Sequence, residues 1–152
     1  GLDKALGEAT GKLGNTQALM ESVGDALVSC TMKRFDEKKD PKGKPWKPSR
    51  RAIEKGGETL TNKGRLRDSI DYAATPDKVM VGSNLTYARI HQKGGTIKPK
   101  NGKSLKFKGL NGEDVLVKEV TIPARPYLGA SKEDMEEVKA TMANFLAGAF
   151  KA

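Results

Sequence analysis

The chain has 152 residues, of which 28 are basic and 19 acidic, so its formal net charge at neutral pH is +9. This length supports one hydrophobic core, and no apolar run approaches the roughly 18 residues that cross a bilayer. A single cysteine and a single histidine exclude a disulfide framework and an ordinary zinc site. We therefore expect one soluble, unexported domain with no metal, no cofactor and no membrane contact.

The first predicted element is a helix over about residues 16–37. It follows residues 1–15, which are rich in glycine, lack a sustained apolar stripe and indicate a mobile N-terminal arm. From Thr16 onward apolar residues recur on one helical face: Leu19, Val23, Ala26, Leu27 and Cys30. We interpret Cys30 as a small core residue rather than a reactive thiol, because apolar surroundings suppress thiolate formation.

Residues 38–51 contain three prolines and many basic residues, which predict an extended loop. The only tryptophan of the chain, Trp46, lies in this loop near two prolines that stiffen the backbone. Its indole either covers the domain's own core as a lid, which we favour, or anchors another subunit. The loop also supplies the first of two expected basic surfaces, formed by Lys38, Lys39, Arg50 and Arg51.

Three short elements are expected next. Leu66 and Ile70, four residues apart, indicate a helix of about two turns. Residues 72–74 and 78–82 flank a Pro-Asp turn and can pair as a β-hairpin. Residues 84–92 return to helical spacing, and the Gly-Gly pair that follows ends that helix.

Residues 96–121 are expected to form a projecting β-arm. Leu105 and Phe107 alternate with polar residues, and Val115 and Val117 do the same after a strong Asn-Gly turn signal. These apolar residues would share one face of a hairpin. Lysines of this region form the second expected basic surface: Lys98, Lys100, Lys103, Lys106 and Lys108.

The last predicted element is a helix over about residues 132–150. Ser131 and Asp134 have the spacing of a capping box, and acidic residues in the first turn suit the helix dipole. Its apolar stripe consists of Met135, Val138, Met142, Phe145, Leu146 and Ala149. Helices and about four strands together predict a single α+β domain, with helices packed on a small antiparallel sheet and a projecting β-hairpin.

The sequence shows no cluster typical of catalysis. His91 could act as a general base with Tyr87 one turn before it, but no spacing brings a nucleophile and an orienting group to them. The Gly-Gly pairs lack the Lys-Ser/Thr ending of a phosphate-binding loop. We therefore expect no enzymatic activity. The positive charge supports a second hypothesis, a basic module that binds nucleic acid without sequence specificity.

Five sequence pieces occur in an order that resembles a known family. They are Gly43-Lys-Pro-Trp46-Lys-Pro48, Leu66-Arg-Asp-Ser-Ile70, Val81-Gly-Ser83, Tyr87-Ala-Arg-Ile-His-Gln-Lys-Gly-Gly95 and Ile122-Pro-Ala-Arg-Pro-Tyr-Leu-Gly129. With the terminal helix, this order resembles the phage virion morphogenesis family of Mu-like tailed phages, also called tail completion proteins. The resemblance extends from about Phe35 to the end of the chain.

The resemblance implies a structural virion protein of the phage neck, in which residues 16–152 form a tail-completion domain. Such a protein completes or terminates the tail at its head-proximal end and joins tail to head, after assembly in the host cytoplasm. Tail-end proteins of similar build form rings, so we expect a homo-oligomer, a hexameric ring, that contacts the tail tube and the head–tail connector. Non-specific contact with packaged DNA is a further option, and terminator, head-closure and accessory roles all stay open.

For particular side chains, the expectations are of two kinds. Residues expected at a subunit or partner interface are Trp46, Leu105, Phe107, Arg125 and Tyr127. Arg125 either clamps a carboxylate across the interface or pairs within the chain with an acidic residue such as Glu133 or Asp134. Residues expected to have structural roles are Gly82, Tyr87, His91, Gln92, Gly95, Pro123 and Pro126. Gly82 and Gly95 are expected where a side chain would clash, and His91 and Gln92 are expected to hydrogen-bond the turn after them.

Overall fold

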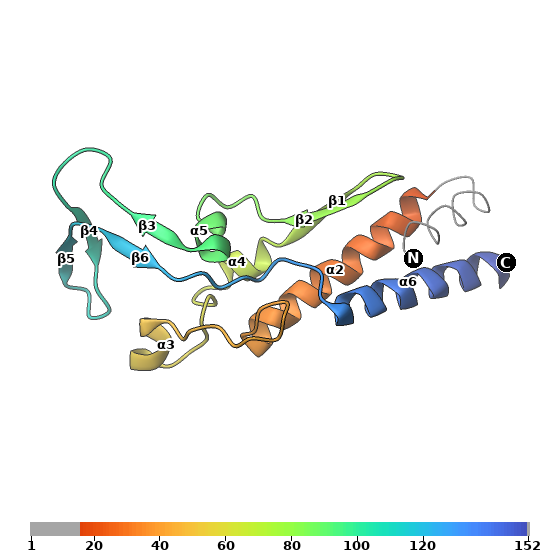
Figure 1. The fold of residues 1–152 in the computed structure, drawn as a ribbon, viewed down its shortest axis with the longest axis horizontal. Coiled ribbons are helices and arrows are strands. Elements are labelled where there is room, and N and C mark those ends of the chain that lie inside the picture. The colour runs from red at the N-terminus through yellow and green to blue at the C-terminus, as the bar shows by residue number, and fades with distance from the viewer. Residues whose placement is uncertain (1–15, 152) are drawn as a thin grey trace.

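Two long helices form one end of the structure and a β-arm forms the other, as Figure 1 shows. The computed structural model describes residues 16–151, with side chains as far as residue 148. The expected N-terminal arm, residues 1–15, lies outside the described residues. The helices are α2 (Gln17–Glu37), α3 (Arg50–Lys55), α4 (Arg65–Asp68), α5 (Ala88–Lys93) and α6 (Lys132–Lys151).

The α+β class is confirmed, but the strands do not join into one sheet. The strands are β1 (Asp71–Ala74), β2 (Val79–Gly82), β3 (Gly95–Ile97), β4 (Leu105–Lys108), β5 (Asp114–Val117) and β6 (Val120–Ile122). In the described part of the chain they form three separate two-stranded antiparallel ribbons, β1–β2, β3–β6 and β4–β5. Each ribbon is short, so the helices and the long connections supply most of the core.

Helices α2 and α6 pack side by side through the apolar stripes that the sequence predicts. Leu19 and Val23 of α2 and Val138 and Met142 of α6 form one buried cluster. The capping box at the start of α6 is confirmed, because the Ser131 amide donates to the Asp134 carboxylate and the Asp134 amide donates to the Ser131 hydroxyl, each at 3.0 Å. Local signals therefore place both helices correctly.

A second core lies where the end of α2 meets the Trp46 loop and the segment before α6. The Phe35 ring contacts Trp46 edge-on at 5.6 Å between centroids and Tyr127 at 5.3 Å. The indole Nε1 donates to the Pro126 carbonyl at 2.8 Å, and the Tyr127 hydroxyl donates to the Ala88 carbonyl at 2.8 Å. The lid interpretation of Trp46 is confirmed, since only 6% of this residue is exposed.

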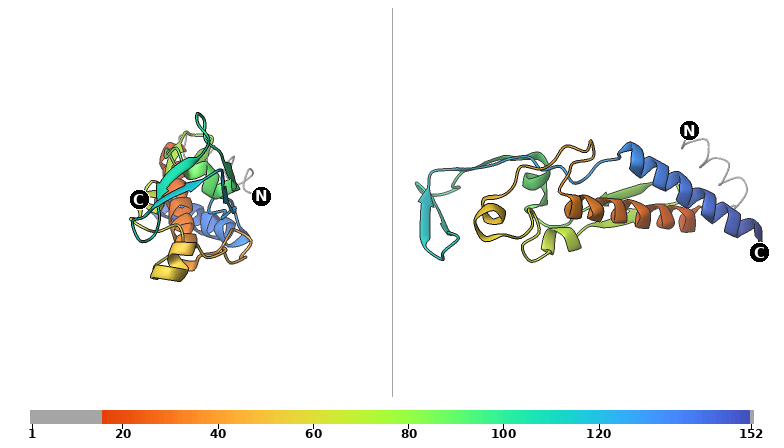
Figure 2. Two further views of the ribbon diagram at one scale, coloured as in Figure 1. Left: turned by 90° about the vertical axis from the view of Figure 1, so that its left-hand side faces the viewer. Right: turned by 90° about the horizontal axis from the view of Figure 1, so that it is seen from below.

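The arm consists of two ribbons in series. β3 and β6 lead away from the body, and β4–β5 turns across their direction at the far end (Figure 2). The register pairs Leu105 with Val117 and Phe107 with Val115, so these four apolar residues share one face as expected. The hairpin contacts the body where the Lys55 ammonium group donates to the Leu110 carbonyl.

Three short helices differ from expectation, and one of them, α5, begins at Ala88 rather than at residue 84. Residues 38–51 were expected as loop throughout, yet α3 begins at Arg50, because the Ser49 hydroxyl accepts from the Ala52 amide at 3.2 Å and caps it. The Leu66 helix, α4, has one turn rather than the two expected. Ser69 follows it, and the Ser69 hydroxyl donates a hydrogen bond to the Leu66 carbonyl at 2.6 Å. Side-chain hydrogen bonds of serine decide the boundaries of α3 and α4.

The glycine expectations hold at one position and fail at the other. Gly95 has φ +151°, and a Cβ there would lie 3.1 Å from the Ile90 side chain. Gly82 has open space around it and ordinary φ, so the expected clash there is wrong. The tighter position is Gly94, where φ is +69° and a Cβ would lie 2.6 Å from the Ala124 amide nitrogen.

We predict that Gly94→Ala lowers the free energy of unfolding by about 1–3 kcal/mol, because both the backbone conformation and the close approach to Ala124 oppose a side chain. Gly82→Ala is the matched control and should stay within about 0.5 kcal/mol of the parent. Urea denaturation monitored by Trp46 fluorescence measures both. Equal losses in the two variants would contradict this account of the turn.

Candidate interaction site

The residues expected at an interface fall into a buried group and an exposed group. Trp46 and Tyr127 are 6% and 1% exposed and are covered by their own chain, so they lack the exposed surface for the interface contact expected of them. Leu105 and Phe107 lie on the arm, and Phe107 is 44% exposed. The aromatic residues therefore belong to the core, and the arm carries the exposed apolar group.

The arm presents apolar side chains on both faces. Phe107 lies among Leu105, Val115 and Val117 on one face, and Leu116 on the opposite face is 66% exposed. Ile97, nearer the body on β3, is 41% exposed. Exposed apolar side chains gathered on a projecting ribbon are typical of a protein–protein contact.

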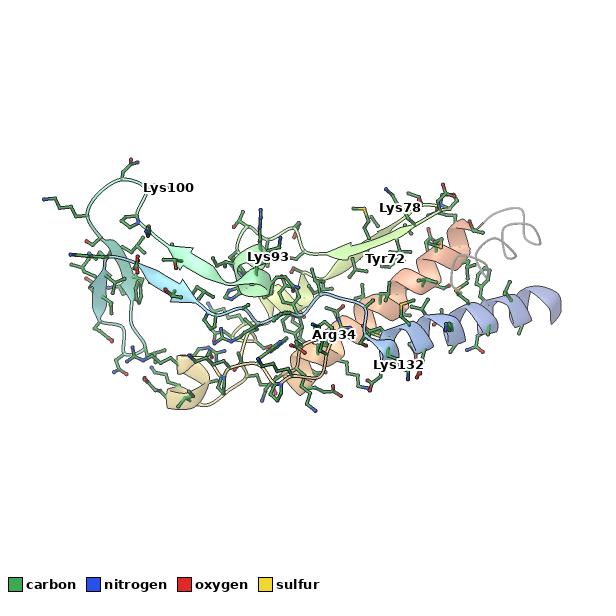
Figure 3. The ribbon with its side chains drawn as sticks, viewed as in Figure 1. Arg34, Tyr72, Lys78, Lys93, Lys100 and Lys132 are labelled. Carbon is green, nitrogen blue, oxygen red and sulfur yellow. The ribbon has the colours of Figure 1, made fainter. Side chains whose placement is uncertain are left out.

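The arm also carries the second of the two expected basic surfaces. Residues 95–122 contain six lysines and three acidic residues. Lys106 and Lys108 share the Asp114 carboxylate at 3.5 and 2.6 Å, and Lys98 lies 3.9 Å from Glu119. Lys100 and Lys103 have no ion pair among the described residues, and Figure 3 shows Lys100 pointing away from the body.

The first basic surface is partly neutralised within the chain. Arg50 pairs with Glu54 at 2.7 Å, and Lys38 lies 4.0 Å from Glu58. Arg51 donates to the Glu58 carbonyl at 2.6 Å. Lys39 is exposed, and its backbone forms an isolated antiparallel β-bridge with that of Pro45. Lys42, Lys44 and Lys47 of the same loop form no ion pair within the described residues, so both basic surfaces keep unpaired positive charge.

A pocket with basic walls lies between α3, α4 and α5. It has a volume of about 330 Å³ and includes Arg51, Lys63, Arg65, Tyr87, His91 and Arg125 in its lining. At its buried side Arg125 is 7% exposed; its backbone amide donates to the His91 carbonyl at 2.8 Å and its Nε to the Lys47 carbonyl at 2.7 Å. We call this cavity the Arg125 pocket.

Two pKa values in the Arg125 pocket are displaced by burial. Desolvation lowers the pKa of Arg125, and desolvation together with the nearby Arg125 charge lowers the pKa of His91. The His91 Nδ1 atom is buried and has no hydrogen-bond partner. The lining of the pocket therefore holds positive charge and an unpaired polar atom and includes no acidic residue.

Asp134, one of the intrachain partners expected for Arg125, pairs with a different arginine. Arg34 of α2 forms a buried ion pair with Asp134, and its Nη1 donates to the Tyr127 carbonyl at 2.8 Å. Figure 3 shows Arg34 where the end of α2 meets the start of α6. Arg34 was not expected in this role from the sequence, although a basic residue on the apolar stripe of α2 and an acidic cap on α6 are both visible signals.

Gln92 has a structural role, but with another partner than expected. Its Oε1 accepts from the Tyr127 and Leu128 amides, each at 2.9 Å, and its Nε2 donates to the Leu128 carbonyl at 3.1 Å. It therefore holds the segment before α6 rather than the turn after α5. Pro123 and Pro126 lie half-buried in that segment.

Cys30 and the acidic residues give no sign of chemistry. The thiol is half-buried, and desolvation is the main cause that raises its pKa, which disfavours the thiolate. Within residues 16–151, no three His, Cys, Asp or Glu side chains gather in a way that could hold a metal ion. No helix in that same range is both long and apolar enough to span a bilayer.

Comparison with known proteins gives a family for this arrangement. The model of the phage virion morphogenesis family matches residues 1–147. The chain belongs to this family. It is 30% identical, over 137 residues, to a protein of Escherichia phage Mu provisionally named capsid assembly protein G. The match covers 84% of this chain and 78% of the Mu protein. No solved structure matches the chain.

Membership in this family gives the chain a part in building the phage virion. The resemblance expected from the five sequence pieces is therefore confirmed, and it reaches further toward the N-terminus than expected. For a virion morphogenesis protein, an exposed apolar ribbon and a basic pocket are candidate contacts with other virion chains.

Proposed function

We propose that this virion morphogenesis protein is a structural component of the phage neck. Copies of it assemble head to tail into a ring at the head-proximal end of the tail, complete the tail and join it to the head. Its partners are the tail tube and the connector proteins, and its role includes no catalytic step. The observation that carries the proposal is the difference between the two ends of the elongated structure (Figure 1).

One end of the molecule is an apolar, basic arm, and the other is acidic with an apolar groove. Helix α2 carries four acidic and two basic side chains and helix α6 four acidic and three basic ones, so the helix pair has a small negative net charge. Between α2 and α6 lies a cavity of about 240 Å³, lined by apolar residues such as Met20, Leu27 and Met135. Arm and groove thus match in their apolar character, and the net charges of the arm and the helix pair are opposite in sign.

Two unlike ends favour a contact that repeats in one direction. When one surface of a subunit binds a different surface of its neighbour, the contacts close into a ring if the rotation allows it. An extended ribbon suits such a contact because it adds main-chain pairing to side-chain burial. We propose that the arm of one copy docks along the α2–α6 groove of the next, and that six copies match the tail symmetry.

A phage unable to make this protein tests the proposal. We expect its lysates to contain DNA-filled heads and separate tails that do not join, with joining restored when the parent protein is supplied. Absence of heads, with normal tails, would instead place the protein in capsid assembly and contradict the neck role. Electron microscopy of lysates distinguishes the two outcomes.

The unpaired lysines of the arm favour one other candidate, a module that binds nucleic acid without sequence specificity. Lys100 and Lys103 could neutralise phosphates, and each such contact contributes a slope of about −0.9 to the dependence of log affinity on log salt. Retention of duplex DNA by the purified protein, measured over a salt series, tests this candidate. Tight binding that falls steeply with salt would favour the nucleic-acid module.

A further inference from the structure

The two buried arginines of the structure differ in how their charge is balanced. Arg34 is 6% exposed and pairs with the Asp134 carboxylate. Arg125 is 7% exposed, and within the described residues its side chain donates to the Lys47 carbonyl at 2.7 Å. No ion pair to Arg125 occurs within the described part of the chain. A buried cation without an anion is unfavourable unless a partner supplies one.

The surroundings of Arg125 add to this imbalance. Arg51, Lys63 and Arg65 lie in the lining of the same pocket, and no acidic residue does. His91, also in the lining, has a buried Nδ1 atom without a hydrogen-bond partner. The pocket therefore offers several donors and no acceptor of matching charge.

We propose that the Arg125 pocket binds a carboxylate side chain presented by an acidic segment of another protein. The Arg125 guanidinium group forms the charge-assisted hydrogen bonds with this carboxylate. The cations Arg51, Lys63 and Arg65 attract the acidic segment to the mouth of the pocket. This site goes beyond the ring contact proposed above and does not depend on it.

The shape of the pocket favours a protein side chain over nucleic acid. Arg125 is almost fully buried, whereas duplex phosphates lie on a convex surface and contact side chains that reach outward. Leu60, Leu66 and Tyr87 contribute apolar lining that fits the methylene groups of a glutamate and an apolar neighbour. A cavity of about 330 Å³ accommodates such a side-chain pair.

The single histidine of the chain makes the site easy to observe, because its ring gives one set of NMR signals. The experiment titrates the full chain with the peptide acetyl-Ala-Leu-Glu-Ala-amide and follows the His91 ring protons at constant ionic strength. We expect a saturable shift, with binding at least about tenfold weaker for the Gln counterpart of the peptide. A 20-base-pair duplex should give no saturable shift of these protons.

Variants locate the binding in the pocket. Arg125→Gln should abolish the saturable shift, and Trp46 fluorescence verifies that the core is retained. If Arg125→Gln does not fold, Lys63→Gln and Arg65→Gln, both at exposed positions, should each weaken binding several-fold. Arg50→Gln is the matched control, since Arg50 is exposed and lies outside the pocket.

Three results would overturn the proposal. The first is equal binding of the Glu and Gln peptides or no saturable shift with either, and the second is unchanged binding in the pocket variants. The third is a saturable shift with the DNA duplex in place of the peptide. All are measured on the isolated chain, so they are independent of whether the ring forms.

Discussion

Replacing Phe107 by Asp should weaken self-association of the protein by at least about 100-fold while leaving its fold intact. Phe107 is 44% exposed and lies opposite Val115 on the apolar face that the arm presents. In the proposed ring this face is buried in the groove of the neighbouring copy, where an aspartate would be desolvated without a partner. Sedimentation velocity over a concentration series measures the change.

The opposite face of the same ribbon supplies the control. Leu116 is 66% exposed, and its neighbours on that face include Lys106 and Lys108. Leu116→Asp changes charge and polarity as much as the Phe107 variant does, but it should weaken association far less. Equal effects of the two variants, or normal assembly of Phe107→Asp, would remove the apolar face of the arm from the contact.

Replacing Arg34 by Met should lower the free energy of unfolding by about 3–5 kcal/mol. The substitution removes the hydrogen bond to the Tyr127 carbonyl and leaves the buried Asp134 carboxylate without its cation. Asp134 also caps α6, so the substitution destabilises the start of α6, where that helix meets α2. Urea denaturation followed by circular dichroism measures it.

The neighbouring residue offers a matched control. Lys33 pairs with Glu37 at 3.7 Å on the surface of α2, with 67% of its side chain exposed. Lys33→Met should change the free energy of unfolding by less than about 1 kcal/mol, since exposed pairs contribute little. A similar small loss for Arg34→Met would show that the buried pair does not join α2 to α6.

The sequence was sufficient for elements whose signals are local. The stripe from Leu19 to Leu27 and the capping box at Ser131 predicted α2 and α6, because helical periodicity and caps depend on near neighbours in the chain. The Asn-Gly turn likewise predicted the β4–β5 hairpin, although the observed register leaves a loop of five residues, 109–113, rather than a two-residue turn. The order of five motifs predicted the family.

Features that depend on distant contacts were not predicted. The partner of Asp134 is Arg34, 100 residues earlier in the chain, and spacing alone could not choose it over Arg125. Gln92 binds a segment about 35 residues away rather than the adjacent turn. The approach of Gly94 to Ala124 is equally remote in sequence, so Gly82 could not be told from Gly94 before the fold was known.

The Arg125 pocket depends on both local signals and distant contacts. His91 and Arg125 were each noted as motif residues, but only the fold brings them together with Lys63 and Arg65 around one cavity. The absence of an acidic neighbour in that lining is a property of the assembled structure. Sequence patterns alone do not show whether a buried charged side chain has a partner of opposite charge in the folded chain.

A cryo-electron microscopy reconstruction of the neck in mature particles tests the central claim most directly. The account predicts a ring of this chain between the last tail ring and the connector, with the β4–β5 hairpin of each copy lying on the α2–α6 face of the next. Particles whose neck lacks this chain, or a ring in which the arms touch no neighbouring copy, would contradict it.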